Sequence, residues 1–415
     1  MKYFVLLCDG AADRKISKLG DKTPLEAAVK PTFNMLSYRS FNGLTANSSK
    51  NYPADPYAGF LSVCSYDPDA IPGFAAIDAL SAGVGLTEED TVFRCSFVTL
   101  SDEEEYTDKR ITGLGEDITP EETSALIRAL NKGVCGSSKL KKFCPVSDTG
   151  CCFVWKRASE TAGACSPYGI KGERTGDHLQ AGKLQPILKK SYEVLNDHPV
   201  NVKRREEGKS PLNSIWLWSA GKKPEFEPFD EKWRTSSAVI TDSGVVAGIA
   251  GCAGMKVIDV PAADGAEDLD KKAQAATDEF SAGTEFVLLH VSSVAKRSLE
   301  GDAQGKVEAI QDADSRVLAP VYEYLCGCGD QFKLLVSTGM PAPCEDRAYS
   351  SEELSPFFMY NSQRTEVGYK PFSENNAKKS GFCLPEGFRF LSFMIRLPAP
   401  VKEETQEENG QQQLQ

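Results

Sequence analysis

The feature that most constrains the fold of this chain is a series of short apolar runs, each bounded by turn-forming residues and separated from the next by helical stretches. Strands that are buried on both faces read as nearly continuous apolar segments, so the pattern is typical of a mostly parallel sheet with helices on both faces. We therefore expect an α/β protein. The runs are residues 3–8, 97–100, 215–218, 238–240, 256–260, 286–291 and 333–337.

Helix signals support this pattern. Thr23 and Thr119 each stand directly before a proline, which predicts a helix N-terminus because proline suits the first helical turn. Three glycines spaced three apart lie inside an apolar helical run rather than between a strand and a helix, which favours close helix packing over a nucleotide-binding loop. These glycines are Gly248, Gly251 and Gly254.

Charge and length limit the class of protein. The chain of 415 residues carries 47 Lys and Arg against 59 Asp and Glu, a formal net charge of −12. A nucleic-acid binder needs a basic surface to displace counterions, so we expect no nucleic-acid partner. The longest near-apolar run, residues 245–255, is shorter than the ~18 residues of a membrane span, so we expect no membrane partner. The length predicts two or three domains of ~150 residues.

The cysteine pattern bears on the cellular compartment. The 13 cysteines form an odd number with neither a regular spacing nor paired Cys-x-x-Cys motifs. This favours reduced, mostly buried thiols over a metal site or a disulfide framework. At the N-terminus, Asp9 interrupts the first apolar run before a secretory signal is complete. We therefore expect a cytoplasmic protein.

A longer series of motifs runs through most of the chain. In order, they are residues 7–10 (LCDG), 20–28 (GDKTPLEAA), 65–68 (SYDP), 93–99 (FRCSFVT), 196–201 (NDHPVN), 204–209 (RREEGK), 216–218 (WLW), 290–291 (HV), 300–302 (EGD) and 308–310 (EAI). In the order and spacing of these motifs, up to about residue 391, the chain resembles the archaeal-type cofactor-independent phosphoglycerate mutases of the alkaline phosphatase superfamily.

The resemblance implies a three-layer α/β/α core like that of alkaline phosphatase, with a mostly parallel sheet, and a smaller α+β insert domain. We expect the core at residues 1–92 and 176–400, the insert at 93–175, and a disordered acidic and Gln-rich tail at 401–415. In active members, a serine carries the phosphoryl group as 3-phosphoglycerate becomes 2-phosphoglycerate in glycolysis. Two divalent cations, Mn, Zn or Co, clamp the attacking and leaving oxygens at the carboxyl ends of the strands.

Most of the positions that this chemistry requires are changed here. Asp9 is the only retained metal-ligand position. The nucleophilic serine corresponds to Pro56, which has no hydroxyl group, and the next family acid corresponds to Tyr57. Disturbing even an outer partner of a metal ligand typically costs ~10- to 100-fold in affinity or activity, so these losses indicate a fold retained around an overwritten site. The other ligand positions correspond to Ala295, Leu299, Gly339 and Met340, with a downstream one near Ser350.

The substrate-binding positions are changed as well. The family's arginine and histidine positions correspond to Phe74 and to residues 150–151 and 167–169. The segment 197–218 survives, and three of its side chains either bind substrate by holding an anion or form salt bridges that fasten the insert to the core. These are Asn201, Arg204 and Arg205.

Replacements for the missing nucleophile have little support in the pattern. Ser62 lies six residues after Pro56, where a helix turns it elsewhere. Asp55 can in principle accept a phosphoryl group, as aspartyl phosphates do, but the cations are missing. A reactive thiol at Cys64 or Cys151 needs a nearby base or a helix N-terminus, and no sequence signal supplies one.

Three functional hypotheses follow. The first is a pseudoenzyme, a homologue of 2,3-bisphosphoglycerate-independent phosphoglycerate mutase that has lost its nucleophile and two-metal site and keeps a structural, regulatory or interaction role. The second is an active mutase with a rebuilt site, which needs two divalent cations, whereas the first needs no cofactor. The third is a metal-free binder of a phosphorylated metabolite. The partners expected are therefore proteins or a phosphorylated small molecule.

Overall fold

The computed structural model describes residues 1–51, 54–71, 73–115, 117–158, 163, 165–179, 182–263 and 265–395. The chain forms two compact units. The first contains residues 1–68, 229–242 and 255 onward, and the second contains residues 69–228 and 243–254. The expected tail at 401–415 lies outside the described residues.

The first unit contains β1 (Lys2–Cys8), α1 (Pro24–Ala27), α2 (Pro31–Tyr38), β2 (Phe41–Thr45), α3 (Pro56–Val63), α9 (Phe229–Trp233), β8 (Ser237–Thr241), β9 (Lys256–Asp259), α11 (Leu269–Ser281), β10 (Phe286–Val291), α12 (Ser293–Glu300), α13 (Ala303–Asp312), α14 (Ala319–Gly327), β11 (Phe332–Ser337), β12 (Ser355–Asn361), α15 (Glu374–Lys379), β13 (Cys383–Leu384) and α16 (Phe390–Ile395).

The second unit contains α4 (Ala75–Ser81), β3 (Thr91–Leu100), β4 (Ile111–Leu114), α5 (Pro120–Leu130), β5 (Lys141–Pro145), β6 (Cys151–Trp155), α6 (Thr175–His178), α7 (Leu184–Leu195), α8 (Pro199–Glu206), β7 (Ser214–Lys222) and α10 (Gly244–Cys252).

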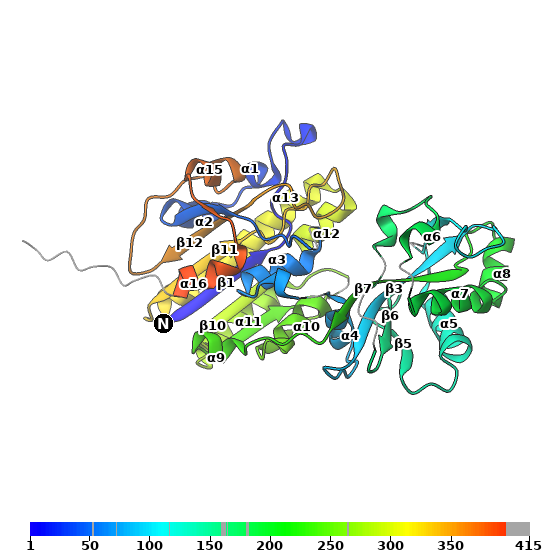
Figure 1. Cartoon of the computed structure of the whole chain (residues 1–415). Helices are drawn as coiled ribbons and strands as arrows, with labels where there is room; N and C mark the ends of the chain where they lie inside the picture. The colour runs from blue at the N-terminus through cyan, green and yellow to red at the C-terminus, as the bar shows by residue number, and fades with distance from the viewer. Residues whose placement is uncertain are drawn as a thin grey trace, which may run out of the picture. The chain divides into compact units, whose positions relative to one another are not determined.

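The sheet of the first unit is mostly parallel. Its eight strands have the order β13-β2-β12-β11-β1-β10-β8-β9. The five strands from β11 to β9 in this order form one block in which all adjacent pairs are parallel. The antiparallel strand β12 joins this block to β2. Figure 1 shows this sheet with helices packed along it. The predicted α/β class is confirmed.

Helices cover both faces of this sheet because its strands are apolar on both sides. On one face, Phe4 of β1 meets Phe280 of α11, with ring centroids 6.2 Å apart. On the other face, Phe357 of β12 meets Phe390 of α16 at 4.9 Å. The neighbouring Phe358 points to the first face, where it joins the core formed with α2, α11, α13 and α14. Burial on both faces explains why the strands read as continuous apolar runs.

The second unit has an antiparallel sheet, which corrects one expectation. The runs 97–100 and 215–218 lie in β3 and β7, which pair with each other antiparallel rather than joining the parallel sheet. Helices also cover both faces here, since α4 packs in one apolar cluster and α5 and α7 pack in another. An apolar run indicates that a strand is buried on both faces, but it does not indicate the direction of the partner strand.

The second unit is wider than the insert predicted at 93–175. Strand β7 pairs with β3 along most of its length, so residues up to 228 belong to this unit. Helix α10 also belongs to it and packs on α4, where a Cβ built on Gly248 would lie 1.8 Å from Ser81 Oγ. This contact confirms that Gly248 permits close helix packing.

The two predicted helix starts are confirmed as capping boxes. Thr23 Oγ1 accepts a hydrogen bond from the Glu26 amide at 3.1 Å, and the Glu26 carboxylate accepts one from the Thr23 amide. Thr119 and Glu122 form the same pair of contacts at the start of α5. The 13 cysteines are free and most are buried, as expected. Within the described ranges, no helix has the length and apolar character that crossing a bilayer requires.

Candidate active site

The loops that follow three neighbouring parallel strands converge at one edge of the first unit's sheet. Strand β1 lies between β11 and β10 and is parallel to both, so the carboxyl ends of all three strands share this edge. Asp9 directly follows β1, and Gly10 forms a bridge with Pro341 from the loop after β11. This edge is where ligands bind in open parallel sheets, and it is where the resemblance places the catalytic centre.

The Asp9 carboxylate is already engaged by other groups of the protein. Its Oδ2 accepts a hydrogen bond from the Tyr349 hydroxyl at 2.7 Å, and its Oδ1 accepts one from the Met340 amide at 3.3 Å. Burial raises the pKa of Asp9 to about 6, although these hydrogen bonds oppose the rise. Burial and the neighbouring Asp9 charge also raise the pKa of Tyr349, so this hydroxyl remains a donor. Both carboxylate oxygens therefore have protein partners.

Apolar side chains fill the positions around Asp9. Met340 is 0% exposed, and a Cβ built on Gly59 of α3 would lie 2.9 Å from its Cγ. Ala295 of α12 is buried, and a Cβ on Gly10 would lie 2.9 Å from its Cα. These contacts show close packing where the family is expected to have a histidine and an aspartate.

Gly339 permits this packing because it lacks a side chain. Its φ of +62° lies in the left-handed region, and a Cβ built on it would lie 2.1 Å from Asp9 Oδ1. Its carbonyl accepts hydrogen bonds from Asn47 Nδ2 at 2.6 Å and from Ser355 Oγ at 2.7 Å. An acidic side chain at 339 would therefore require a left-handed backbone conformation and would force Asp9 or the backbone to shift.

Pro56 is the first residue of α3, beside the same edge. Asp55 caps this helix by accepting a hydrogen bond from the Tyr57 amide at 3.1 Å, and its charge contributes to the raised pKa of Tyr349. Ser62 is 1% exposed and donates to the Asn47 carbonyl at 3.3 Å, which is a packing role.

The remaining sequence candidates also have packing or surface roles. Burial raises the pKa of the Cys64 and Cys151 thiols, which makes both poor nucleophiles. Leu299 is 42% exposed. Ser350 is buried and donates to Glu353. In the second unit, Phe74 is fully buried.

The three histidines make protein contacts. His290 is buried at the end of β10, with Nδ1 3.0 Å from Thr241 Oγ1. Burial, with a contribution from the Lys272 ammonium, lowers its pKa to about 4, so the imidazole is neutral. His198 accepts from the Val200 amide at 3.3 Å, and His178 contacts Glu173.

The donor set at this edge does not fit a two-cation centre. Such a centre needs several carboxylate and imidazole ligands around each ion. Here Asp9 is accompanied by Ala295, Gly339 and Met340, none of which carries a carboxylate or an imidazole. Among the residues that the structure describes, there is no group of three or more His, Cys, Asp or Glu side chains that could hold a metal ion.

A buried lysine, which the sequence did not indicate, provides a fixed positive charge near the site. Lys306 of α13 is 0% exposed, and its ammonium donates to Asp13 Oδ2 at 2.8 Å and to two backbone carbonyls. These carbonyls belong to Ala12 and Ala342, on the loops after β1 and β11. The Lys306 charge also acts to lower the pKa values of Asp9 and Glu374. The ammonium thus joins the two loops.

The carboxyl group of Glu374 in this cluster gives the stability a pH dependence. It accepts hydrogen bonds from Thr23 Oγ1 at 2.7 Å and from the Asp13 amide at 3.1 Å. Burial raises its pKa from 4.5 to about 7, so the folded state binds this proton more tightly than the unfolded state. The resulting stabilisation is complete below pH 4.5 and is lost as the pH rises through about 7.

Glu374→Gln is therefore expected to raise the free energy of unfolding by about 1–3 kcal/mol at pH 8 and to change it little at pH 4.5. Urea unfolding at the two pH values measures this difference. Glu352→Gln is the control, because the Glu352 side chain is 84% exposed. Equal changes at both pH values would contradict the assignment of a raised pKa to Glu374.

The three predicted substrate-binding residues lie in the second unit, whereas Asp9 lies in the first. Asn201 is 0% exposed and bonds to the backbone of Leu195 and Leu212. Arg205 donates twice to Asn196. The intramolecular contacts are those of a structural role, and the substrate-binding role of these residues stays a prediction.

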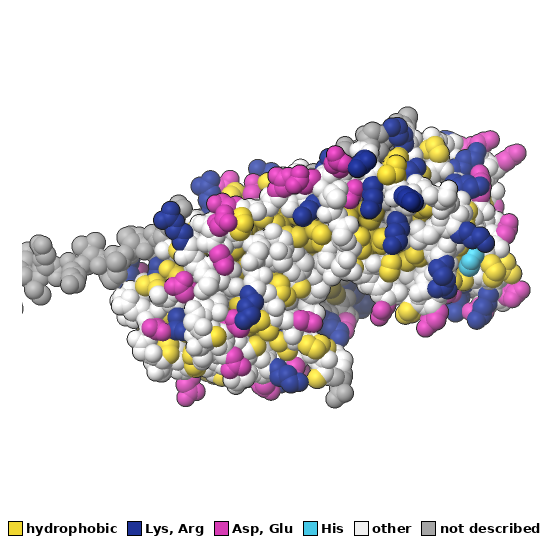
Figure 2. All heavy atoms as spheres, turned by 90° about the horizontal axis from the view of Figure 1, so that it is seen from below, with side chains coloured by type: hydrophobic (Ala, Val, Ile, Leu, Met, Phe, Trp, Pro, Cys, Tyr) yellow, Lys and Arg dark blue, Asp and Glu magenta, His cyan; other side chains and the backbone are white. Residues whose placement is uncertain are grey.

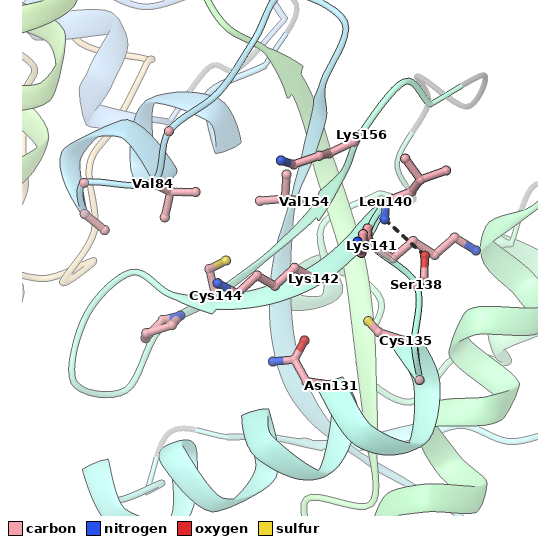
Figure 3. Close-up of a pocket in the computed structure, with 16 residues that line it drawn as sticks. Val84, Asn131, Cys135, Ser138, Leu140, Lys141, Lys142, Cys144, Val154 and Lys156 are labelled. Atoms are coloured by element: carbon pink, nitrogen blue, oxygen red, sulfur yellow. Dashed lines mark hydrogen bonds between the residues drawn. The ribbon is translucent and has the colours of Figure 1, made fainter.

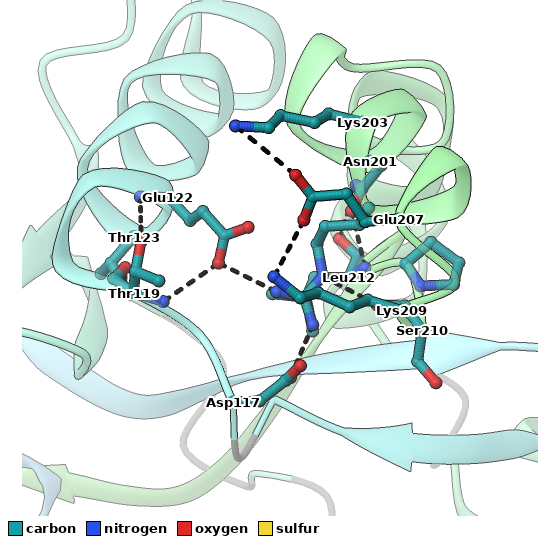
Figure 4. Close-up of polar contacts among 12 residues, drawn as sticks. Asp117, Thr119, Glu122, Thr123, Asn201, Lys203, Glu207, Lys209, Ser210 and Leu212 are labelled. Carbon is teal, nitrogen blue, oxygen red and sulfur yellow. Dashed lines mark hydrogen bonds and ion pairs between the residues drawn. The ribbon is translucent and has the colours of Figure 1, made fainter.

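Arg204 has the most contacts of the three. Its side chain is 1% exposed and donates to Ser210 O at 2.8 Å, to Glu122 at 2.9 Å and to Asp117 at 2.5 Å. Figure 4 shows these acidic side chains reaching α8 from the start of α5 and the loop before it. Of the three residues, Arg204 thus forms salt bridges to acidic side chains, and these bridges join segments of one unit rather than an insert to a core.

Arg204→Ala is expected to lower the free energy of unfolding by about 2–4 kcal/mol, because three charge-assisted hydrogen bonds and a buried side chain are lost together. Chemical denaturation measures the effect. The matched control is Lys203→Ala on the same helix, where the side chain is 75% exposed and the expected change is below about 0.5 kcal/mol. Similar values for the two variants would show that the Arg204 contacts do not stabilise the unit.

Known structures and sequences resemble the whole chain. A solved structure from Pyrococcus horikoshii matches with a TM-score of 0.73 and 25% identity, covering 95% of this chain and 96% of that chain. A cofactor-independent phosphoglycerate mutase from Thermoplasma acidophilum matches with a TM-score of 0.61 and 23% identity, covering 96% of this chain and 100% of that chain. The second likeness supports the fold alone.

The sequence comparisons define the family. A family model described as 2,3-bisphosphoglycerate-independent phosphoglycerate mutase matches residues 38–201. A protein of that name from Methanosarcina barkeri is 32% identical over 403 residues, which cover 95% of this chain and all of the relative. A probable mutase of the same kind from Geobacter sulfurreducens is 33% identical over the same shares of both chains. The chain therefore belongs to the family of 2,3-bisphosphoglycerate-independent phosphoglycerate mutases.

Proposed function

We propose that this chain is a catalytically silent member of the mutase family, which acts by binding other molecules rather than by phosphoryl transfer. The observation that carries the proposal is the state of Asp9. Its two oxygens are bonded to Tyr349 and Met340, and a Cβ at the neighbouring Gly339 would clash with the Asp9 carboxylate. The retained carboxylate therefore serves the packing of the loops.

The position where the resemblance predicts the nucleophile that carries the phosphoryl group is occupied by Pro56. Phosphoryl transfer through the enzyme needs an oxygen nucleophile, and the proline at position 56 supplies none. The nearby Ser62 is buried on α3 and donates to the Asn47 carbonyl. The proposal thus has two separate supports, the surroundings of Asp9 and the proline at position 56.

The partners proposed for a silent homologue are proteins in the cytoplasm. The net charge of −12 favours electrostatic association with basic surfaces. A phosphorylated metabolite bound without metal is a weaker candidate, because the N–H groups of Arg204 are already bonded to Ser210, Glu122 and Asp117.

An enolase-coupled assay that converts 3-phosphoglycerate to 2-phosphoglycerate tests the proposal. The full chain is assayed with Mn²⁺, Co²⁺, Zn²⁺ or Mg²⁺, beside the Methanosarcina barkeri relative. The expected rate is at least about 10⁴-fold below that of an active relative, since removal of a catalytic nucleophile typically costs this much or more.

The decisive control is Asp9→Asn, matched by Asp102→Asn on the exposed surface. Metal-dependent turnover that disappears in Asp9→Asn and persists in Asp102→Asn would overturn the proposal in favour of a rebuilt active site. A thermal shift with 3-phosphoglycerate in the absence of metal, lost in Arg205→Ala, would instead favour the metabolite binder.

A further inference from the structure

A pocket of about 850 Å³ lies within the second unit, outside the site described above. Its lining includes four lysines and, among the residues that the structure describes, no Asp or Glu. Apolar side chains of Val84, Val154 and Leu140 contribute to its wall, as does the thiol of Cys144. Figure 2 shows Lys and Arg side chains on the viewed face of this unit, although the whole chain is acidic. The lysines are Lys139, Lys141, Lys142 and Lys156.

The strands of the pocket wall place Cys144 next to a second cysteine. Cys144 of β5 is directly opposite Cys152 of β6 in the antiparallel register. The amide of Val146 bonds to Gly150 O at 3.1 Å, and hydrogen-bonded pairs recur every second residue, so Cys144 and Cys152 also form such a pair. Opposite residues of this kind have Cα atoms about 5.5 Å apart, which lies within the range of disulfides.

The surroundings make Cys144 the more reactive of the two thiols. A hydrogen bond from the Cys152 thiol and the charges of Lys142 and Lys156 lower the pKa of Cys144 to about 7. The same hydrogen bond and burial raise the pKa of Cys152. Figure 3 shows Lys142 and Cys144 on the same side of β5, with Val154 of β6 and Lys156, which directly follows β6. A thiolate can therefore form at the pocket wall beside a thiol that can react with it next.

We propose that Cys144 and Cys152 are a redox-active dithiol, which an anionic low-molecular-weight disulfide, such as glutathione disulfide, oxidises from this lysine-lined pocket. The Cys144 thiolate attacks one sulfur of the small disulfide, its S–S bond breaks, and one thiolate leaves. Cys152 then loses its proton and attacks Cys144 Sγ, and the second thiolate leaves. The protein loses two electrons to form one disulfide, and the small disulfide gains them to become two thiols.

Two other cysteine arrangements are the natural comparisons. Cys135 also lines the pocket, but burial raises its pKa to about 11, so it reacts slowly. Cys95 and Cys151 form a second cross-strand pair. Neither of these two cysteines lines the pocket, and burial raises the pKa of Cys151. We therefore expect oxidation at Cys144 and Cys152 before either alternative.

Peptide mapping of the full chain after incubation with glutathione disulfide tests the proposal. The expected product is a disulfide between Cys144 and Cys152, reversed by reduced glutathione. Cys152→Ala should retain one glutathione on Cys144, whereas Cys144→Ala should leave Cys152 unmodified. Cys326→Ala, which removes an exposed thiol, should still form the internal disulfide. Reaction confined to other cysteines, with Cys144 and Cys152 still free, would overturn the proposal.

The contribution of the lysines is tested separately with a neutral reagent. The measured quantity is the ratio of two rates of Cys144 modification, by glutathione disulfide and by the neutral 2-hydroxyethyl disulfide. In the double variant Lys142→Gln/Lys156→Gln this ratio should fall about tenfold, which is the low end of rate effects in charged clefts. Lys171→Gln, an exposed substitution in the same unit, should leave this ratio unchanged. An unchanged ratio in the double variant would show that the pocket does not select anionic disulfides.

Discussion

Gly339→Asp, which places an acid where the resemblance predicts a metal ligand, is expected to lower the free energy of unfolding by about 3–5 kcal/mol. The new Cβ would lie 2.1 Å from Asp9 Oδ1, so the backbone or Asp9 must move. The second carboxylate would also repel the first, and displacement of Asp9 would break its hydrogen bond to Tyr349. Urea unfolding with and without Mn²⁺ measures the effect, and we expect Mn²⁺ to restore none of the lost stability.

The matched control is Gly329→Asp in the same unit. Gly329 also has a positive φ, at +76°, but a Cβ built there meets no atom within 4 Å. The expected cost is therefore only the backbone strain of about 1–2 kcal/mol. If Gly339→Asp cost no more than this control, or if Mn²⁺ restored its stability, the edge of the sheet would be able to form a cation site.

Lys306→Ala is expected to lower the free energy of unfolding by about 3–5 kcal/mol, because it leaves a buried charge without its partner. The Lys306 and Asp13 side chains are 0% and 1% exposed and lie 2.8 Å apart. The substitution also removes the contacts to the carbonyls of Ala12 and Ala342. Equilibrium unfolding at neutral pH gives the value.

Lys296→Ala serves as the reference for this prediction, because Lys296 is exposed on the adjacent helix α12. It should change the stability by less than about 0.5 kcal/mol. Lys306→Ala/Asp13→Ala should be less harmful than the sum of its single variants, since the buried charge is then removed with its partner. Strict additivity would mean that the ammonium does not balance Asp13.

Much of the fold followed from local sequence signals. The runs that became β1, β8, β10 and β11 are strongly apolar because helices cover both faces of their sheet, and burial leaves a clear trace in sequence. The capping boxes could also be predicted, because all of their contacts lie within four residues of the sequence.

Other parts of the fold have no such trace. Strand β5 is only five residues long and contains two lysines and a proline, so its pattern does not distinguish a strand from a loop. Strands β3 and β7 were found as apolar runs, yet their antiparallel partnership depends on contacts between residues more than a hundred positions apart. Local periodicity reports burial and not the choice of partner.

Some residues of the candidate site could be predicted from the sequence, and others could be found only in the structure. The predicted changes at positions 56, 295, 339 and 340 came from alignment to ordered motifs, which needs no geometry. Tyr349 was missed because it reaches Asp9 across a sequence separation of 340 residues, and no motif surrounds it. Arg204 was identified as an ion-pair or anion-binding residue, but only the positions of Asp117 and Glu122 reveal how its guanidinium is used.

Metal stoichiometry tests the loss of the two-cation centre most directly. The full chain is stripped of metal, titrated with Mn²⁺ by calorimetry, and compared with Asp9→Asn. We expect no stoichiometric high-affinity binding, and identical titrations for the two proteins, because the Asp9 oxygens are bonded to Tyr349 and Met340. Two equivalents of Mn²⁺ bound per chain, and lost in Asp9→Asn, would show that the centre persists.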